Sequence, residues 1–288
     1  MSEISAAAVV ELRKMSGQGM MDCKKALQEA NGDIEQAMDI LRKKGLATLA
    51  KRASRETSEG VVVGKSSPDG KTSTLATLCC ETDFVAKSDD FVALAGKLAD
   101  VAMACTADQG AENILATSVS SKTFNDILTE TVSRTGEKMQ VGDYAKYKLD
   151  GPGLIRTYIH FNSKVGTMLH IETGNEATGA SDAMKRIAAD IAMHITATKP
   201  LALSKDQIDP KTIEREKAIF AEQVKNKPAN MVTKIVEGKM QKFYAENCLL
   251  QQAFVKDDSK SVEQVLNEAA TAAGGQAKIT RFVRFEVG

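Results

Sequence analysis

Five cysteines and three histidines are the residues that metal or redox chemistry would need, and they are scattered along the chain. None of them stands in CxxC or HxxxH spacing. Cys79 and Cys80 are adjacent in a predicted strand, where successive side chains point to opposite faces, so they cannot easily share a metal. We therefore predict no metal site, and the unpaired cysteines favour reduced thiols in the cytoplasm.

Motifs that cradle phosphate or carry a serine nucleophile are missing as well. The sequence contains no GxxxxGKS, GxxxxGKT, GxGxxG or GxSxG segment. Phosphate binding through such loops and catalysis by a serine nucleophile therefore have no support in the sequence, and we expect no bound cofactor.

Residues 81–87 suggest binding instead, because charged side chains flank a single aromatic ring. The segment follows a β-rich run and precedes an amphipathic helix, so Asp83 and Phe84 are predicted on a connecting loop. Loops of this kind present side chains outward, where they can meet a partner. The alternative is that Phe84 folds back into the local core.

Three short helices are predicted in residues 1–55 as a separate N-terminal module. Ser5 can cap a helix over 6–14, and a second helix is predicted over 22–30. Asp33 is a good N-cap for a third helix, which we expect to end at Gly45. This pattern suggests a ubiquitin-associated-like module, and the alternative is a purely structural small bundle.

Residues 56–138 are predicted to form the first core subdomain, with a hairpin and two helices. Two β-rich runs, at 61–65 and 74–81, are separated by a Pro-Asp-Gly turn signal. An apolar face recurs at helical spacing through 91–105, and a second helix is predicted over 121–134.

From Met139 the alternation becomes strand-like again, and we assign 139–199 and 246–288 to a second core subdomain. Its first three strands are predicted to form an antiparallel meander, followed by a helix that stops before Pro200. The last strand is expected to join the same sheet. The predicted strands are 141–149, 154–161, 165–172 and 281–287.

Residues 200–245 are predicted as an inserted helical hairpin. Its two charged helices, near 210–225 and 229–246, have a narrow apolar seam, so the hairpin should protrude and offer a place for association. The fold class is therefore α+β, with a three-helix module, two subdomains that have small antiparallel sheets plus helices, and an inserted hairpin.

Several segments resemble the elongation factor Ts family, and they occur in the family's order. Leu12-Arg13 with SGQGMMDCKKAL at 16–27 is similar to its N-terminal motif, and ETDFVAK at 81–87 is similar to its second motif. Further similar segments are RTGE at 134–137, IAMH at 191–194 with Lys199-Pro200, VEGKM at 236–240, and RFVRFEV at 281–287. The resemblance thus spans nearly the whole chain.

The resemblance implies a guanine-nucleotide exchange factor for elongation factor Tu, the GTPase that delivers aminoacyl-tRNA during protein biosynthesis. Because such exchange involves no covalent chemistry, the resemblance also implies that the protein is not an enzyme. In the family, the Asp-Phe pair of the second motif engages the GTPase domain of the partner. The positions implied as partner contacts are Asp83 and Phe84, flanked by Thr82 and Val85; Arg13, Met20 and Met21; Thr135 and Gly136, toward the Mg²⁺ and phosphate side; and His160, on a strand face with Arg156 and Tyr158. Met21 is equally open to a core position, and a homodimer within a 2:2 complex is compatible with the resemblance.

The sequence departs from the family pattern in several places. Thr77 and Cys79 stand where the second motif usually opens with an acidic residue and Asn, and Thr135 replaces a commonly apolar residue. Many bacterial relatives continue past the position of Gly288 into a C-terminal helix that contacts the partner. We therefore expect that contact to be missing or replaced.

Two other classes of function stay open. One is an adaptor in which the ubiquitin-associated-like module recruits other chains without exchange activity, and the other is an enzyme with a pocket between its two β-containing halves. The adaptor predicts binding with no effect on nucleotide release, whereas the enzyme predicts a cluster of perturbed acids or bases in a cleft.

Charge and composition narrow the partners further. Lys plus Arg and Asp plus Glu are both 38, so no strong field attracts the chain to nucleic acid or an anionic membrane. No basic leader precedes an apolar run, and no stretch reaches the roughly 20 apolar residues that span a bilayer. We expect a soluble cytoplasmic protein that binds neither nucleic acid nor membrane.

Overall fold

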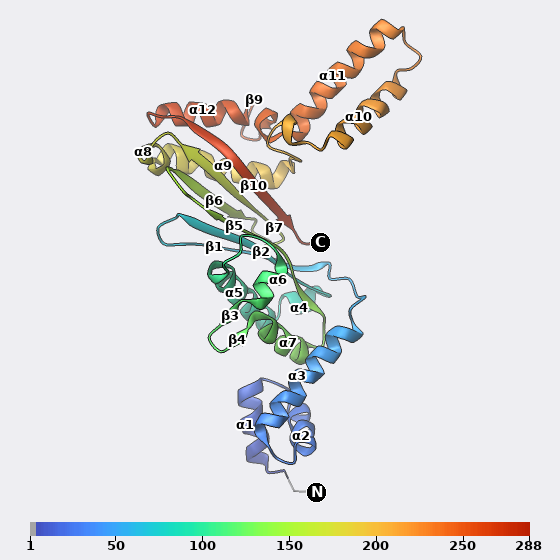
Figure 1. Cartoon of the computed structure of the whole chain (residues 1–288), viewed down its shortest axis with the longest axis vertical. Helices are drawn as coiled ribbons and strands as arrows, with labels where there is room; N and C mark the ends of the chain where they lie inside the picture. Colours follow the sequence, from blue (N-terminus) through green and yellow to red (C-terminus); the bar gives the residue numbers. More distant parts are fainter. Residues whose placement is uncertain (1–3) are drawn as a thin grey trace.

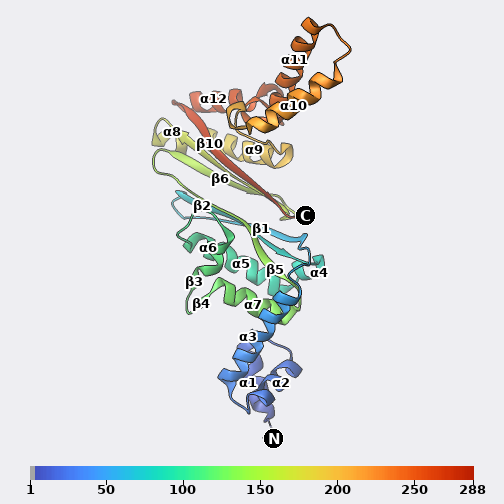
Figure 2. The same cartoon turned by 45° about the vertical axis from the view of Figure 1, so that its right-hand side comes forward.

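The computed structural model describes residues 4–288, except for the side chains of residues 229 and 230. The molecule is elongated, with a helical module at the N-terminal end, two sheets in the middle and a helical hairpin at the far end (Figure 1). The view turned by 45° shows the same order along the long axis (Figure 2). The predicted α+β class with two small antiparallel sheets is confirmed. Within the described residues, no helix has the length and hydropathy to cross a bilayer.

The N-terminal module consists of α1 (Ala6–Ser16), α2 (Met20–Glu29) and α3 (Ile34–Lys51). Ser5 accepts a hydrogen bond from the Ala8 N–H, and Asp33 accepts one from Gln36, so both predicted caps are confirmed. The three helices bury their own small core.

The predicted end of the third helix at Gly45 is wrong, because α3 continues to Lys51. Gly45 instead allows α3 to lie against α7 (Phe124–Thr135). A Cβ at position 45 would lie 2.5 Å from the carbonyl oxygen of Thr129 and 2.9 Å from its Cγ2. Periodicity cannot distinguish a glycine that ends a helix from one that allows close packing.

The first sheet has the order β1-β2-β5 and is antiparallel throughout. Its strands are β1 (Glu59–Ser66), β2 (Thr72–Cys80) and β5 (Met139–Lys148). The predicted hairpin is confirmed, and α5 (Asp89–Ala104) and α7 pack over the sheet with Phe91, Leu98 and Val132 buried. The smaller elements of this half are α4 (Asp83–Ala86), α6 (Ala111–Ala116), β3 (Ser118–Val119) and β4 (Lys122–Thr123).

The second sheet has the order β10-β7-β6. Its strands are β6 (Gly153–Ile159), β7 (Val165–Thr173) and β10 (Ala277–Glu286), so the expected return of the last strand is confirmed. Two helices, α9 (Asp182–Thr198) and α12 (Val262–Ala272), pack on this sheet. The smaller elements are α8 (Glu176–Ala180), β8 (Ala253–Phe254), β9 (Asp257–Ser261) and the 3-10 turns η1 (Lys205–Gln207) and η2 (Leu249–Gln251).

The predicted meander is wrong in its first strand. β5 pairs with β2, in a register that runs from Thr72 opposite Lys148 to Cys80 opposite Met139, and only β6 and β7 pair as expected. The chain therefore changes sheets at 149–152. We revise the proposed boundary between the two subdomains from 138/139 to this turn. Alternation identifies a strand, but it does not identify the neighbour with which the strand pairs.

The two sheets pack face to face, between the two layers of helices (Figure 1). Val62 and Leu75 of the first sheet meet Met168 of the second in a buried apolar cluster. A Cβ at Gly166 would lie 2.6 Å from Val62 Cγ1, so a glycine is needed for this approach.

The inserted hairpin consists of α10 (Pro210–Gln223) and α11 (Ala229–Asn247), which project from the end of the second subdomain (Figure 2). No residue of α10 is buried. The base is anchored where Ile213 and Tyr244 pack against Cys248.

Candidate functional site

The segment around Phe84 is a single turn of helix, α4, and not the predicted open loop. Thr82 is its N-cap, and the Thr82 hydroxyl accepts a hydrogen bond from the Val85 N–H at 3.3 Å. The prediction that Phe84 is exposed is confirmed, since 83% of the residue is accessible. Val85 is half-buried and packs on the core beneath the turn. The helix therefore has an inner side that packs and an outer side that displays an aromatic ring.

A carboxylate from a distant part of the chain holds α4 in place. Glu137 Oε2 accepts from the Thr82 N–H at 3.1 Å, and its Oε1 accepts from the Thr82 hydroxyl at 2.9 Å. Glu137 directly follows Gly136, the C-cap of α7. The two segments that the resemblance implies as separate partner contacts are thus joined by one side chain.

A second carboxylate connects the same region to the N-terminal module. The Arg52 guanidinium donates to both Glu81 oxygens at 2.9 and 2.7 Å, and the Lys138 N–H donates to Glu81 Oε1 at 2.7 Å. Burial alone would raise the pKa of Glu81, but the Lys138 N–H and Arg52 outweigh it and lower the pKa. Glu81 therefore stays ionised and links the end of α3 to the start of β5.

The charges beside Phe84 pair with each other. Lys87 Nζ lies 2.7 Å from Asp83 Oδ2, and this hydrogen bond lowers the pKa of Asp83 and raises that of Lys87. Both side chains are largely solvent-exposed, so the pair contributes little to stability. A partner could exchange this pairing for its own charges without leaving a buried charge behind.

The contact residues expected in the N-terminal module are on its surface. Arg13 is exposed on α1, and Met20 and Met21 at the start of α2 are 49% and 63% exposed. The core alternative for Met21 is therefore wrong. A Cβ at Gly17 would lie 3.0 Å from Arg134 Cδ, so the turn before Met20 lies against the end of α7.

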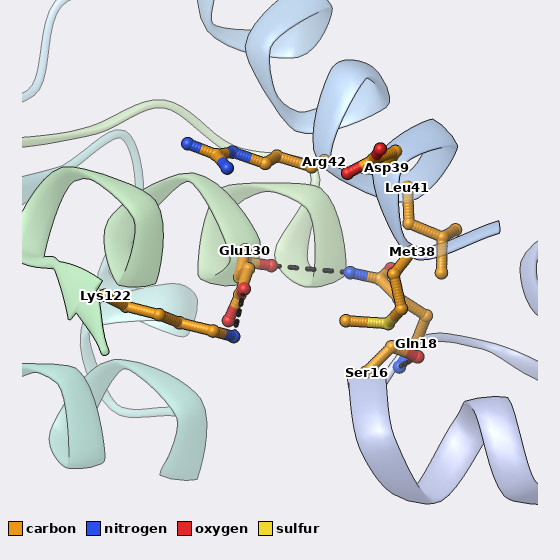
Figure 3. A pocket seen from close by; sticks show the side chains of 8 residues that line it. All are labelled: Ser16, Gln18, Met38, Asp39, Leu41, Arg42, Lys122 and Glu130. Atoms are coloured by element: carbon orange, nitrogen blue, oxygen red, sulfur yellow. Dashed lines mark hydrogen bonds and ion pairs between the residues drawn. The ribbon is translucent and has the colours of Figure 1, made fainter. Parts of the chain in front are cut away.

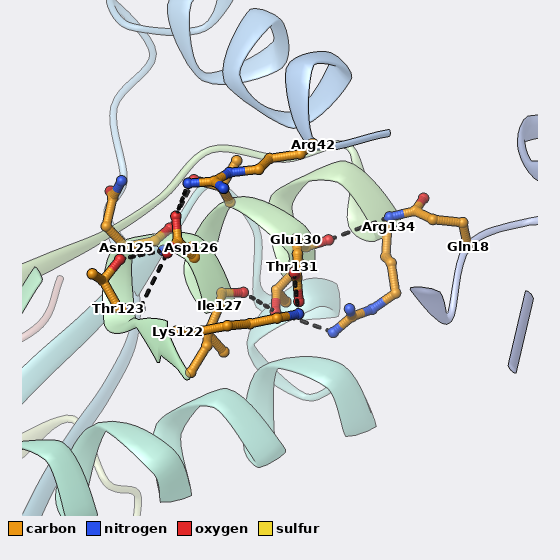
Figure 4. Close-up of polar contacts among 11 residues, drawn as sticks. Gln18, Arg42, Lys122, Thr123, Asn125, Asp126, Ile127, Glu130, Thr131 and Arg134 are labelled. Carbon is orange, nitrogen blue, oxygen red and sulfur yellow. Dashed lines mark hydrogen bonds and ion pairs between the residues drawn. The ribbon is translucent and has the colours of Figure 1, made fainter. Parts of the chain in front are cut away.

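Polar contacts fix the module on α7 (Figure 4). Gln18 Nε2 donates to the Glu130 carbonyl at 3.4 Å, Ser133 Oγ donates to the Leu41 carbonyl at 3.2 Å, and Arg42 pairs with Asp126. A cavity of about 190 Å³ lies between them (Figure 3). It is lined by Ser16, Gln18, Met38, Asp39, Leu41, Arg42, Lys122 and Glu130.

The Thr135-Gly136 segment is half-buried at the end of α7. Gly136 has φ of 73°, the left-handed geometry that ends a helix, and its N–H bonds to the Val132 carbonyl. The Thr135 hydroxyl donates to the Thr131 carbonyl at 3.1 Å. Arg134, one residue earlier, pairs with Asp90 at 2.9 Å.

The predicted strand position of His160 is wrong, because β6 ends at Ile159 and His160 lies just past it, in the turn to β7. Its Nδ1 is 3.2 Å from the Tyr158 hydroxyl, which supports the predicted shared face for these two residues. The partly exposed imidazole packs against the ring of Phe161 at 4.4 Å between centroids.

These segments follow one another along a continuous strip of the molecule. The turn at Gly17 lies against Arg134, Glu137 binds Thr82, and β1 begins beside α4 and pairs through Glu59 with Lys164 in the β6–β7 turn. The strip therefore runs from the N-terminal module to the second sheet. Among residues 4–288, no three His, Cys, Asp or Glu side chains converge as a metal site.

Comparison with known proteins assigns the family. The family model described as Elongation factor TS matches residues 81–288. The chain belongs to the elongation factor Ts family. It is 44% identical to elongation factor Ts of a Nitratiruptor species, over 99% of this chain and 93% of the relative. It is 42% identical to the protein of Clostridium botulinum (strain Eklund 17B / Type B), with the same coverage. The identity to that of Nitratidesulfovibrio vulgaris (strain DP4) is 41%, over 99% of this chain and 96% of the relative.

As a member of the elongation factor Ts family, the chain is a translation elongation factor, and the resemblance stated from its motifs is confirmed. Sequence reasoning missed the roles of Glu137 and Arg52, whose partners are 55 and 29 residues away along the chain. Glu137 stands inside a recognised segment, but no local pattern indicates that its carboxylate faces Thr82.

Proposed function

We propose that this protein is a guanine-nucleotide exchange factor that binds elongation factor Tu with GDP and promotes GDP release. The observation that carries the proposal is Phe84, an exposed ring on a helical turn that Glu137 holds from below. Membership of the elongation factor Ts family supports the identity of the partner. Protein synthesis also makes the cytoplasm the proposed location.

Exchange of this kind needs no bond chemistry, only linked binding equilibria. GDP leaves slowly because backbone amides and Mg²⁺ hold its phosphates. An exchange factor that binds the partner best when this phosphate site is distorted lowers the partner's affinity for nucleotide. Bound nucleotide lowers the partner's affinity for the exchange factor by the same factor, so GTP can displace the exchange factor.

Phe84 can supply free energy of the required size. Burying a Phe side chain in an apolar pocket stabilises a complex by roughly 1.5–3 kcal/mol. This corresponds to about one to two powers of ten in the affinity for nucleotide. Because α4 is already fixed by Glu137, little of this free energy is lost in ordering the turn.

The other positions act along the same strip in this proposal. Arg13 with Met20 and Met21 would contact a helix of the GTPase domain, and methionine suits an adaptable apolar contact. Thr135 and Gly136 would approach the Mg²⁺ and phosphate side. His160 would contact the same domain from the second subdomain. A 2:2 complex, in which two copies of this protein form a homodimer and each binds the partner, is a further part of the proposal.

The test is the release of a fluorescent GDP from elongation factor Tu, followed in stopped flow with and without this protein. We expect GDP release to accelerate with the concentration of this protein until the rate saturates. Excess GTP should compete with this protein for binding to the partner. An adaptor would bind the partner, as seen by calorimetry, yet leave the release rate unchanged. That outcome would reject the exchange function.

A further inference from the structure

The turn between β6 and β7 carries the most exposed large apolar side chain among the described residues. Phe161 is 90% exposed, compared with 83% for Phe84. It lies outside the segments by which the family was recognised, and no role has been given to it above. Single exposed apolar residues are common, so exposure alone assigns nothing.

The backbone that presents Phe161 is fixed on several sides. Within the turn, the Ser163 N–H donates to the His160 carbonyl at 2.8 Å and the His160 N–H donates to the Val165 carbonyl at 2.9 Å. The Val62 N–H of β1 donates to the Ser163 carbonyl at 2.7 Å. The turn is therefore fastened to the first sheet, and docking Phe161 on a partner would order little additional chain.

The ring itself is supported on one side only. The His160 imidazole lies 4.4 Å from it, tilted by 50°, and the Tyr158 hydroxyl bonds to His160 Nδ1. The remaining surface of the ring is open to solvent. This geometry displays an aromatic side chain outward in a defined direction.

The turn and α4 flank the same end of β1. Glu59, the first residue of β1, forms an ion pair with Lys164 in the turn. The hydrogen bond to Asp83 is the main cause of the raised pKa of Lys87, at the end of α4, and the negative charge of Glu59 adds to it. Both views place α4 and this end of the second sheet on one side of the molecule (Figures 1 and 2).

We propose that Phe161 is a second aromatic anchor for the GTPase partner, which covers Phe84 and Phe161 in one complex. The proposal rests on the proposed function, because the partner is chosen by continuity with Phe84 and His160. Aromatic side chains at the centre of an interface dominate its affinity, and each brings a large apolar area at a low entropic cost.

The experiment compares Phe161→Ala with two other variants in calorimetric binding to nucleotide-free elongation factor Tu and in stimulated GDP release. Phe161→Ala should bind about tenfold more weakly and keep its melting temperature. Phe161→Tyr retains the ring and should bind as the parent does. Val255→Ala removes another exposed apolar side chain, 52% accessible in the β8–β9 turn, and should change neither quantity.

A double variant decides whether both rings act on one partner. Phe84→Ala with Phe161→Ala should lose roughly the product of the two single fold-changes. Parent-like affinity of Phe161→Ala, or a double variant no weaker than Phe84→Ala, would overturn the proposal while leaving the exchange function intact. A change of self-association alone, seen by sedimentation velocity, would also overturn it. Failure of the unmodified protein to accelerate GDP release would instead reject the proposed function.

Discussion

At the scale of single residues, Phe84 and Phe91 are only seven positions apart but occupy opposite environments. Phe84 is 83% exposed on α4, and Phe91 is fully buried under the first sheet. Phe84→Ala should slow stimulated GDP release by at least about tenfold and shift the melting temperature by only a few degrees. The reason is that its ring touches solvent, and not the core, in the free protein.

The matched comparison is Phe91→Ala, which should lower the free energy of unfolding by about 3–5 kcal/mol. Stopped-flow release and thermal unfolding of both variants provide the measurement. If Phe84→Ala lost stability as Phe91→Ala does, with exchange preserved per folded molecule, Phe84 would have to be assigned to the core.

Glu137 is a positioning residue for α4, and its replacement should act through Phe84. In Glu137→Gln, the amide group has only one acceptor oxygen for the two Thr82 donors, so one donor is left unsatisfied. We expect GDP release to slow severalfold and amide hydrogen exchange at 82–87 to speed up. Glu56→Gln, which changes an exposed carboxylate, should have neither effect.

Coupling between the two residues separates positioning from general loss of stability. Because Glu137 acts by holding Phe84, adding Phe84→Ala to Glu137→Gln should cause little further loss of exchange. Independent, multiplicative losses would contradict this role.

At the scale of elements, the packing of α3 on α7 depends on Gly45. Gly45→Ala would force a Cβ to 2.5 Å from the Thr129 carbonyl, so we expect a loss of about 1–3 kcal/mol in the free energy of unfolding. Gly238→Ala is the matched control, because Gly238 lies inside α11 with no atom within 4 Å of the added Cβ. That change should stabilise the helix by roughly 0.5–1 kcal/mol.

Urea unfolding of the two glycine variants gives the required free energies. The same packing joins the N-terminal module to the Arg52–Glu81 contact, so Gly45→Ala should also weaken exchange. Equal effects of alanine at positions 45 and 238 would show that the close approach of α3 to α7 is not maintained in solution.

At the scale of the whole molecule, two buried histidines make stability depend on pH. His194 Nδ1 accepts from the Val255 N–H at 3.2 Å, so its Nε2–H donates to Gln252, and burial lowers its pKa. His170 donates from Nε2 to the Lys148 carbonyl of the first sheet and accepts from Thr280 of the second sheet, so its side chain connects the two sheets. Burial again lowers its pKa.

The direction of this pH dependence follows from proton linkage. The unfolded histidines, with a pKa of about 6.5, take up protons before the folded ones do, so stability is full above that pH and falls as the pH drops below it. Each histidine can contribute at most about 1.4 kcal/mol per pH unit. Urea unfolding between about pH 7.5 and 5.5, on either side of the unfolded pKa, gives the free energy of unfolding at each pH. This free energy should depend less steeply on pH in His194→Gln. A free energy of unfolding that rises toward the acidic end would contradict it.

The sequence by itself determined the N-terminal helical module, the β1–β2 hairpin and the amphipathic α5. Each of these depends on local periodicity, caps and turn signals within about 20 residues. Family membership was also recoverable, because its motifs are short and contiguous. Short-range patterns suffice for such features, since backbone hydrogen bonding and the direction of side chains repeat with a fixed local period.

Only the tertiary structure decided which strands are neighbours and which side chains meet. The pairing of β5 with β2, the role of Gly45 and the contact of Glu137 with Thr82 all join residues that are distant along the chain. Such contacts are selected by how the sheets and helices pack globally, and a strand or a carboxylate carries no local mark of its distant partner. The strip that joins Met20, Phe84 and Phe161 is a product of that packing.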